Sequence, residues 1–491
     1  MLEHVLNLAV QKGLVAMEDV DYTRNLFLEV MNMDAPEGET VTGEDLALCF
    51  EKLTDMCVAR GVCEDTLDAR DRFAARLAGC VTPHPSRVRD MFAALEKNVG
   101  PAAATKWFYE LCRNVDYIKV HRISQNIQYT VDSPAGELEI TYNLSKPEKD
   151  PRDIAKARMA KQSGYPKCML CRENPGYAGR VNFPARQNHR ILPVQLAGEK
   201  WYLQYSPYLY YNEHCIVFNG EHVPMHMTEK TFERLFDFAF RFPHYFIGAN
   251  ADLPIVGGSI LSHDHFQGGK YEFPMEKVKT LYEVDAPVKA EVINWPMTCL
   301  RFTSWDYKTL ITIGWNMLEA WREHTDEACG ILACSDGEMH NAITPVVRKK
   351  GDIYQMYLVL RNNRTSEEHP LGIFHPHADL HHIKKENIGL IEVMGLFILP
   401  GRLKTELAAL KPYLTGKGEL PENTPHREWA EKILQENGVQ QDDDAAEQLI
   451  RKAVGKTCYR VLSDCGVYKQ DEQGKRGLDA FLRKVGMKIK D

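Results

Sequence analysis

Gly257-Gly258-Ser259-Ile260-Leu261-Ser262-His263-Asp264-His265-Phe266-Gln267-Gly268-Gly269 is the stretch of this chain that predicts most about its fold. It places His263, His265 and Gln267 at alternate positions. Side chains two residues apart point to the same face of an extended strand, so these three predict a strand with one polar face. The glycine pairs at both ends allow a ligand to approach the backbone closely.

Two imidazoles and a neutral amide on one face suit phosphoryl chemistry. His265 is the predicted nucleophile, because a neutral imidazole nitrogen attacks phosphorus readily and also leaves it readily, which splits a transfer into two displacements. Gln267 cannot titrate, and its amide can only donate hydrogen bonds to charged phosphoryl oxygens. The pair therefore favours transfer to a second substrate over hydrolysis. The alternative is a strand with two ordinary, partly buried histidines.

The composition is that of an ordinary globular protein. The chain has 491 residues, 44% of them hydrophobic, which is enough for roughly two to four domains. Its net charge of -8 gives no electrostatic footprint for nucleic acid, so no such partner is expected. The N-terminal residues include an acid, Glu3, and no basic run, so no secretory signal is expected. The most apolar stretch, 388–400, contains Glu392 and is too short to span a bilayer. We therefore expect no membrane association.

The cysteines predict a compartment and a metal site. The 13 cysteines are an odd number scattered over a long chain, which argues for a reducing, cytoplasmic location. Cys168 and Cys171 stand in a C-x-x-C pair, a spacing typical of half of a zinc site. His222 and His263 are the best candidates for the other ligands, and the metal would then brace the strand that carries His265. The alternative is two unliganded cysteines.

Helices are predicted near both ends of the chain, and strands lie between them. Residues 1–112 have apolar residues at helical spacing in 70–77 and 88–95, and 401–491 are charged and predicted to be helical. Thr228 is predicted to cap a helix that Pro243 ends. Its apolar positions are Phe232, Leu235, Phe236 and Phe240. The predicted strands are 126–131 and 138–142 (a hairpin), 202–211, 214–218 and 353–360. The basic run 146–161 is predicted to be a solvated linker or a surface helix.

A second His-x-His follows the last of these strands. His375 and His377 stand in a similar order of elements, which indicates a duplicated unit. A second metal site is predicted from His340, His375, His377 and an acid, either Glu272 or Glu276. The alternative is that these histidines are solvated.

Several polar residues could contact the sugar or the phosphates of a nucleotide. Four of them follow the C-x-x-C pair, and one precedes the glycines. The predicted set is Asn182, Arg186, Asn188, Arg190 and Asn250, with Gly257, Gly258 and Ser259 in the glycine turn. The alternative is ordinary surface polarity on loops.

The residues around His265 resemble the signature of a known family. His263-Asp264-His265-Phe266-Gln267 is similar to the His-Pro-His-Gly-Gln signature of the galactose-1-phosphate uridylyltransferases, a branch of the histidine-triad superfamily. The chain most resembles the second class of that family, over nearly its full length. Asp264 and Phe266 depart from the signature. The run 385–389, which begins with Lys385, approximates the family's sugar-binding segment.

The resemblance implies a role for each of these residues. His265 would be the nucleophile, and Gln267 would stabilise a uridylylated intermediate. The zinc site would use Cys168, Cys171, His222 and His263. An iron-like second site would use His340, His375, His377 and Glu272 or Glu276.

The resemblance also implies a reaction and an assembly. A homodimer would transfer the uridylyl group from UDP-glucose to galactose 1-phosphate, in galactose metabolism, through a uridylyl-histidine. Three alternatives stay open: a histidine-triad nucleotidyl hydrolase, a dinucleoside polyphosphate phosphorylase, and a zinc-braced nucleotide-binding protein without turnover.

The implied fold is α+β. It has two histidine-triad-like half-units with antiparallel sheets and a helical region at each end. The predicted bounds are 1–112 for the helical N-terminal region, 113–285 for the catalytic half, 286–400 for the second half and 401–491 for the helical C-terminal region.

Overall fold

The computed structural model describes residues 1–36, 45–145 and 163–490, which form two compact units. The first unit comprises Met1–Gln125 and Ser145–Val223, and the second comprises Asn126–Leu144 and Pro224–Asp491. The predicted linker at 146–161 lies outside the described residues. The domain bounds proposed from the sequence remain a prediction.

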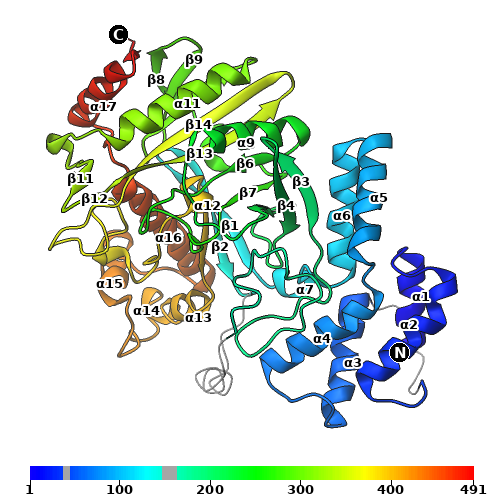
Figure 1. Cartoon of the computed structure of the whole chain (residues 1–491). Coiled ribbons are helices and arrows are strands. Elements are labelled where there is room, and N and C mark those ends of the chain that lie inside the picture. The colour runs from blue at the N-terminus through cyan, green and yellow to red at the C-terminus, as the bar shows by residue number, and fades with distance from the viewer. Residues whose placement is uncertain (37–44, 146–162, 491) are drawn as a thin grey trace. The chain divides into compact units, whose positions relative to one another are not determined.

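The described part of 1–112 is helical, as predicted (Figure 1). The helices predicted at 70–77 and 88–95 are the centres of α4 and α5. The hydroxyl of Thr66 accepts from the N–H of Ala69 and so caps α4, while Pro85 opens α5, where an N–H has no helical partner. The helices of this unit are α1 (Leu2–Gln11), η1 (Met17–Asp19), α2 (Val20–Met31), α3 (Leu46–Ala59), α4 (Leu67–Val81), α5 (Pro85–Asn98), α6 (Pro101–Asn114) and α7 (Val120–Ile123).

Three antiparallel strands complete the first unit. β4 (Glu199–Tyr205) pairs with β3 (Leu192–Leu196) on one side and with β5 (Cys215–Asn219) on the other. The strand predicted at 214–218 is β5, shifted by one residue. The strand predicted at 202–211 is wrong beyond Tyr205, because Pro207 has no N–H to donate to a neighbouring strand.

The second unit is built on an antiparallel sheet that contains the His265 strand. The strands run in the order β16-β8-β9-β10-β14-β13-β6-β7. The strand predicted at 353–360 is most of β14. Their bounds are β6 (Phe246–Gly248), β7 (His265–Gly269), β8 (Thr280–Asp285), β9 (Lys289–Ile293), β10 (Cys299–Ser304), β13 (Asn341–Lys350), β14 (Ile353–Asn362) and β16 (Lys488–Ile489).

A smaller sheet joins distant parts of the second unit. β1 (Ile127–Ser133) and β2 (Gly136–Asn143) form the predicted hairpin, and β15 (Leu396–Pro400) pairs with β2 in parallel. The helix α16 (Asp443–Cys465) packs against β1. A Cβ at Gly455 would lie 2.4 Å from a methyl carbon of Val131, so glycine is what allows this close approach. The strands β11 (Cys334–Ser335) and β12 (Glu338–Met339) form a separate pair.

Two helices cover one face of the large sheet. α9 (Glu229–Arg241) and α11 (Tyr307–Arg322) contact each other and the strand β13 (Figure 1). Thr228 is the N-cap of α9, as predicted, and its N–H donates to the hydroxyl of Thr231 at 3.0 Å. Phe240 is an exception to the predicted apolar face, because it is 65% exposed and lies under the Lys349 ammonium, 5.4 Å from the ring centre.

Four of the remaining described helices lie after residue 400, in the region predicted to be helical, and four short ones lie before it. They are α10 (Pro274–Lys277), η2 (Glu327–Cys329), η3 (Ala378–Leu380), α12 (Leu390–Val393), α13 (Leu403–Ala408), α14 (Lys411–Leu414), α15 (Arg427–Asn437) and α17 (Glu472–Lys484). Helices and antiparallel strands together confirm the α+β class. Across the described ranges, no helix combines the length and the apolar character needed to cross a membrane.

Candidate active site and metal centre

β7 carries two of the three residues that the sequence placed on one face. His265 and Gln267 lie two residues apart in the strand and project to the same side, whereas Phe266 points to the other side and is buried. His263 is in a bend before the strand, so the strand begins two residues later than predicted. Gln267 pairs with Gly248 of β6, which has no side chain to obstruct the amide.

The ring of His265 is oriented by its own backbone. Nδ1 lies 2.8 Å from the carbonyl oxygen of His263. A carbonyl can only accept, so Nδ1 carries the proton and Nε2 keeps its lone pair. Burial lowers the pKa of His265 to about 4, so the ring is neutral near pH 7. A neutral imidazole with a fixed tautomer is the form that can attack phosphorus.

The departure of Asp264 from the family signature has a structural counterpart. Its carboxylate lies 3.7 Å from the guanidinium of Arg234 on α9, and each side chain is only about a tenth exposed. The signature's proline would restrict the backbone at this point. Here an ion pair ties the entry of β7 to a helix instead.

The glycines before His265 are needed for close packing. A Cβ on Gly257 would lie 2.5 Å from the carbonyl oxygen of Ala251, and one on Gly258 would lie 2.6 Å from Nδ2 of Asn250. Neither position has room for a side chain. Ser259, in the same turn, is exposed. Contact between this turn and a ligand remains a prediction.

Three predicted zinc ligands lie together in the first unit. The Sγ atoms of Cys168 and Cys171 are 3.7 Å apart, and Sγ of Cys171 is 3.3 Å from Nδ1 of His222. Two sulfurs that each lie about 2.3 Å from one tetrahedral Zn²⁺ would be about 3.8 Å apart. The cysteine pair therefore fits the ion. Among the described residues, the group that could hold a metal ion comprises these three and His263.

The loop that holds the two cysteines is supported by Asn174. Its amide donates to the carbonyl oxygens of Cys168 at 2.9 Å and Cys171 at 2.7 Å. Burial raises the pKa of the Cys168 thiol to about 11. Zinc binds the thiolate, so binding would release a proton from this side chain.

The structure does not bring the predicted second metal site together in the described residues. His340 is held by the hydroxyl of Ser335 at 2.6 Å and by Oδ1 of Asn363 at 2.8 Å. Glu272 forms an ion pair with Lys350 at 2.7 Å.

The other members of that predicted site also have protein partners. His375 lies 3.3 Å from Oδ1 of Asn387, and Nε2 of His377 lies 3.0 Å from the carbonyl oxygen of Ile373. Glu276, the alternative acid, binds Arg348 at 2.6 Å. None of these residues belongs to the metal-binding group found among the described residues.

Arg190, predicted to contact a nucleotide, donates most of its hydrogen bonds to the protein itself. It is buried, and four of its five N–H groups donate to backbone carbonyls. The acceptors are Pro83 (2.6 Å), Gln187 (2.8 Å), His189 (2.7 Å) and Thr82 (3.1 Å). The side chain holds several loops of the first unit together.

Arg186 and Asn188 have similar positions. Arg186 donates to the hydroxyl of Tyr117 at 3.1 Å, and Asn188 donates to the carbonyl oxygen of Val115 at 3.0 Å. Both side chains are buried, whereas Asn182 is exposed and has a left-handed backbone with φ 68°. Nucleotide contact by these residues remains a prediction.

Two buried cations of the second unit were missed by the sequence patterns. Lys384 is buried and pairs with Glu392 at 3.0 Å, whereas its neighbour Lys385, the predicted binder, is exposed. Arg361 on β14 is only 1% exposed. Charged side chains are rarely buried, and nothing in a single sequence distinguishes such a residue from a solvated one.

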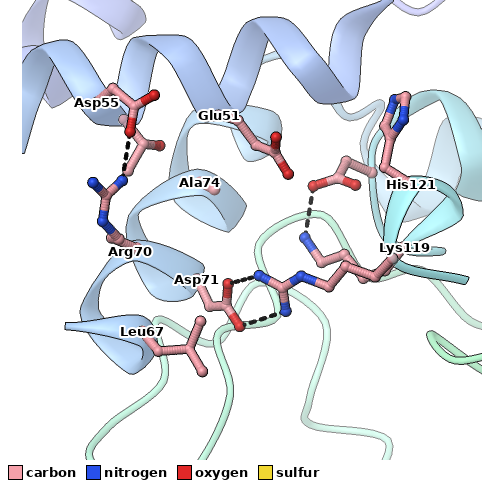
Figure 2. Close-up of a pocket in the computed structure, with 11 residues that line it drawn as sticks. Glu51, Asp55, Leu67, Arg70, Asp71, Ala74, Lys119 and His121 are labelled. Carbon is pink, nitrogen blue, oxygen red and sulfur yellow. Dashed lines mark hydrogen bonds and ion pairs between the residues drawn. The ribbon is translucent and has the colours of Figure 1, made fainter. Parts of the chain in front are cut away.

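A charged pocket of about 190 Å³ lies in the first unit (Figure 2). Arg70 binds Asp55 at 2.6 Å, Arg122 binds Asp71 through two N–H groups, and Glu51 points into the space. These arginines are already neutralised by carboxylates, so the pocket is an ion-pair network and a poor phosphate site. None of the catalytic, metal-binding or substrate-binding residues predicted from the sequence lines it.

Two family models match this chain. A family model described as galactose-1-phosphate uridyl transferase, N-terminal domain, matches residues 16–224. The corresponding C-terminal domain model matches residues 239–430.

Individual relatives match over almost the whole chain. A galactose-1-phosphate uridylyltransferase from Caldanaerobacter subterraneus subsp. tengcongensis is 47% identical over 508 residues, covering 99% of this chain and 98% of that protein. One from Bacillus subtilis is 45% identical over 502 residues, with the same coverage of 99% and 98%. The crystal structure of yeast Ap4A phosphorylase Apa2 matches with a TM-score of 0.33 at 14% identity, covering 72% of this chain and 93% of that one, which is too distant to bear on the fold.

Proposed function

The chain belongs to the galactose-1-phosphate uridylyltransferase family, and from this premise we propose that it transfers the uridylyl group of UDP-glucose to galactose 1-phosphate. The observation that carries the proposal is the buried, neutral ring of His265, whose Nδ1 is tied to the carbonyl oxygen of His263. This arrangement presents a nucleophile beside an amide, Gln267, which cannot donate a proton as an acid.

The reaction takes place in two displacements at one phosphorus atom. Nε2 of His265 attacks the α-phosphorus of UDP-glucose, an N–P bond forms, and the bond to glucose 1-phosphate breaks. A phosphate oxygen of galactose 1-phosphate then attacks the same phosphorus, and the imidazole leaves. The oxygen that departs in the first step belongs to a phosphate, which needs little protonation.

Amide groups stabilise the charge of this intermediate. Gln267 donates to the α-phosphoryl oxygens from the same strand face as His265. Oδ1 of Asn250 accepts from the N–H of Leu390 at 2.8 Å, which leaves the amide N–H groups of Asn250 to donate to substrate. The remaining proposed substrate contacts are Gly257, Gly258, Ser259 and, on the hexose side, Lys385. Asn182 also remains a proposed contact, and so do Arg186, Asn188 and Arg190, although their side chains bind the protein.

A zinc ion would be held by Cys168, Cys171, His222 and His263. Four protein ligands make a closed site, so the ion would supply structural support and no chemistry on the substrate. Its effect on catalysis would pass through His263, whose carbonyl oxygen orients His265.

The proposal includes a location and an assembly. The described cysteines are free thiols, which supports a reducing compartment, the cytoplasm. The active form is proposed to be a homodimer, on the strength of the family resemblance. Analytical ultracentrifugation at the working concentration tests this point.

The sharpest test is to mix the protein with UDP-glucose alone and measure the intact mass. A transferase stalls after the first step and gains one uridylyl group. A hydrolase keeps releasing UMP, and a binding protein without turnover forms no adduct. Continued UMP release or an unchanged mass would refute the proposal.

A substitution at the nucleophile completes the test. His265→Gly should form no adduct and lose exchange, and added imidazole should restore some transfer by filling the space of the missing ring. His226 is an exposed histidine of the same unit, so His226→Gly serves as the matched control and should form the adduct like the wild type.

A further inference from the structure

The segment Lys384–Glu392 is anchored at both ends in the second unit. The Lys384 ammonium and the Glu392 carboxylate form an ion pair at 3.0 Å, with side chains 4% and 13% exposed. Between them, Lys385, Glu386 and Asn387 are exposed, whereas Ile388 and Leu390 are buried. The segment therefore has a polar tip, residues 385–387, followed by a largely buried stem, residues 388–390.

The buried stem lies over the active face of the sheet. A Cβ on Gly248 would meet the side chain of Leu390 at 3.0 Å. Gly248 is the partner of Gln267, and residues opposite each other in a sheet project to the same face. Leu390 thus covers the face on which Gln267 and His265 project.

Arg361 holds the backbone of this stem. Its Nη2 donates to the carbonyl oxygen of Ile388 at 2.9 Å, and Nη1 lies 3.5 Å from the hydroxyl of Thr344. On the other side of Gly389, the N–H of Leu390 donates to Asn250. The side chains of Arg361 and Asn250 therefore fix the two peptide groups that flank Gly389.

Burying the guanidinium of Arg361 costs more free energy than filling the same space with an apolar side chain would. The side chain is 1% exposed, forms no ion pair with any described residue, and leaves its Nε without a hydrogen-bond partner. Burial lowers its pKa to about 10, which still leaves a cation near pH 7. An apolar side chain would fill this space at lower cost.

We propose that Arg361 is a positioning residue for the hexose 1-phosphate, acting through the backbone of Ile388 to hold the tip 385–387 beside His265. The inference rests on the proposed function and adds to it a residue that determines the affinity for one substrate. Arg361 itself does not touch the substrate. Its guanidinium sets the height of the tip above the sheet.

The test compares the binding of two ligands. Arg361→Met should raise the dissociation constant for galactose 1-phosphate by about 10- to 100-fold, because a small misplacement of a binding group costs that much. UMP lacks the hexose, so its dissociation constant should stay within about twofold. Arg361→Lys keeps one donor for Ile388 and should recover part of the loss. Calorimetric titration of both ligands measures all of these values.

A control variant separates positioning from general damage. Arg301 is a largely buried arginine of the same sheet and binds Glu291 at 2.9 Å, so Arg301→Met should lower thermal stability and leave both dissociation constants unchanged. If Arg361→Met does not fold, Arg361→Lys keeps the cation and one donor for Ile388, and a smaller selective loss of galactose 1-phosphate binding in that variant keeps the test decisive.

Equal effects on both ligands, or no effect on galactose 1-phosphate, would overturn this inference. The wild-type adduct with UDP-glucose is measured in parallel. A wild type that forms no adduct refutes the proposed function. A wild type that forms it, beside variants that bind galactose 1-phosphate normally, refutes the role of Arg361 alone.

Discussion

Gln267 and a histidine at the same position would differ in one chemical property. A histidine could donate a proton to a departing group as a general acid, whereas an amide can only donate hydrogen bonds to a charged oxygen. Gln267 is half-buried on β7 and faces the same side as the nucleophile. We therefore expect the proposed uridylyl adduct to be stabilised at this position without being discharged to water.

Gln267→Ala should lower kcat by about 100- to 1000-fold, the usual effect of losing one donor to a charged oxygen. Rapid-quench measurement of adduct formation gives the rate of the first step. Gln195 is exposed on β3, so Gln195→Ala is the control and should react normally. A Gln267→Ala enzyme with wild-type rates would exclude a role for this amide.

His324 should make stability depend on pH. Burial lowers its pKa to about 4, and its Nε2 lies 2.8 Å from the hydroxyl of Tyr468. Since the folded pKa is below the unfolded value of about 6.5, the unfolded chain binds the proton first. The contribution of His324 to the free energy of unfolding is fully present above about pH 6.5. Up to about 3 kcal/mol of it is lost as the pH decreases to about 4.

Denaturant titrations at several pH values test this prediction. His324→Gln keeps a polar group near Tyr468 and cannot titrate, so its stability should fall less between about pH 6.5 and 4. His226→Gln, at an exposed site, should keep the wild-type slope. Identical slopes for His324→Gln and the wild type would contradict the assignment.

Single residues were predictable where their neighbours in sequence carry the signal. Alternation placed His265 and Gln267 on one strand face, and spacing placed Cys168 beside Cys171, which is how they lie in the structure. Arg361 could not be found, because its proposed role depends on a carbonyl 27 positions away in the sequence. Contacts of that kind come from the tertiary fold.

At the scale of elements, local patterns located most of the helices and strands. The hairpin and α9 begin close to where the sequence puts them, because a turn and an N-cap are set by adjacent residues. The errors lie at ends. β4 stops before Pro207, and β7 starts only at His265, since a strand continues only while a neighbour pairs with it.

Replacing Gly314 in α11 should destabilise the protein. A Cβ there would lie 2.6 Å from the ring of Phe232 on α9. Alanine favours helices over glycine by about 1 kcal/mol, but overpacking costs about 1–3 kcal/mol and should prevail. Gly314→Ala should therefore lower the free energy of unfolding by up to about 2 kcal/mol, measured in urea.

The control for this prediction is Gly164→Ala. Nothing lies within 4 Å of a Cβ at Gly164, so that variant should be as stable as the wild type. Equal or greater stability of Gly314→Ala would show that the two helices can separate without cost.

At the scale of the whole molecule, zinc should contribute to thermal stability. The purified protein should contain about one zinc per chain, and a strong chelator should lower its Tm. Cys168→Ser and Cys171→Ser should lose the metal, whereas Cys334→Ser, at an exposed cysteine, should keep it. Elemental analysis with scanning calorimetry gives both values. Full zinc content in Cys171→Ser would exclude this ligand set.

The pairing of β2 with β15 has a consequence for how the chain is made. The hairpin 127–143 leaves the ribosome long before 396–400 are translated, yet one edge of β2 is completed only by β15. During that interval the nascent chain carries an open strand edge, which is a template for aggregation. A ribosome that pauses before residue 396 prolongs this exposure, so the yield of active protein in a cell depends on translation speed and on chaperones as well as on the stability of the finished fold.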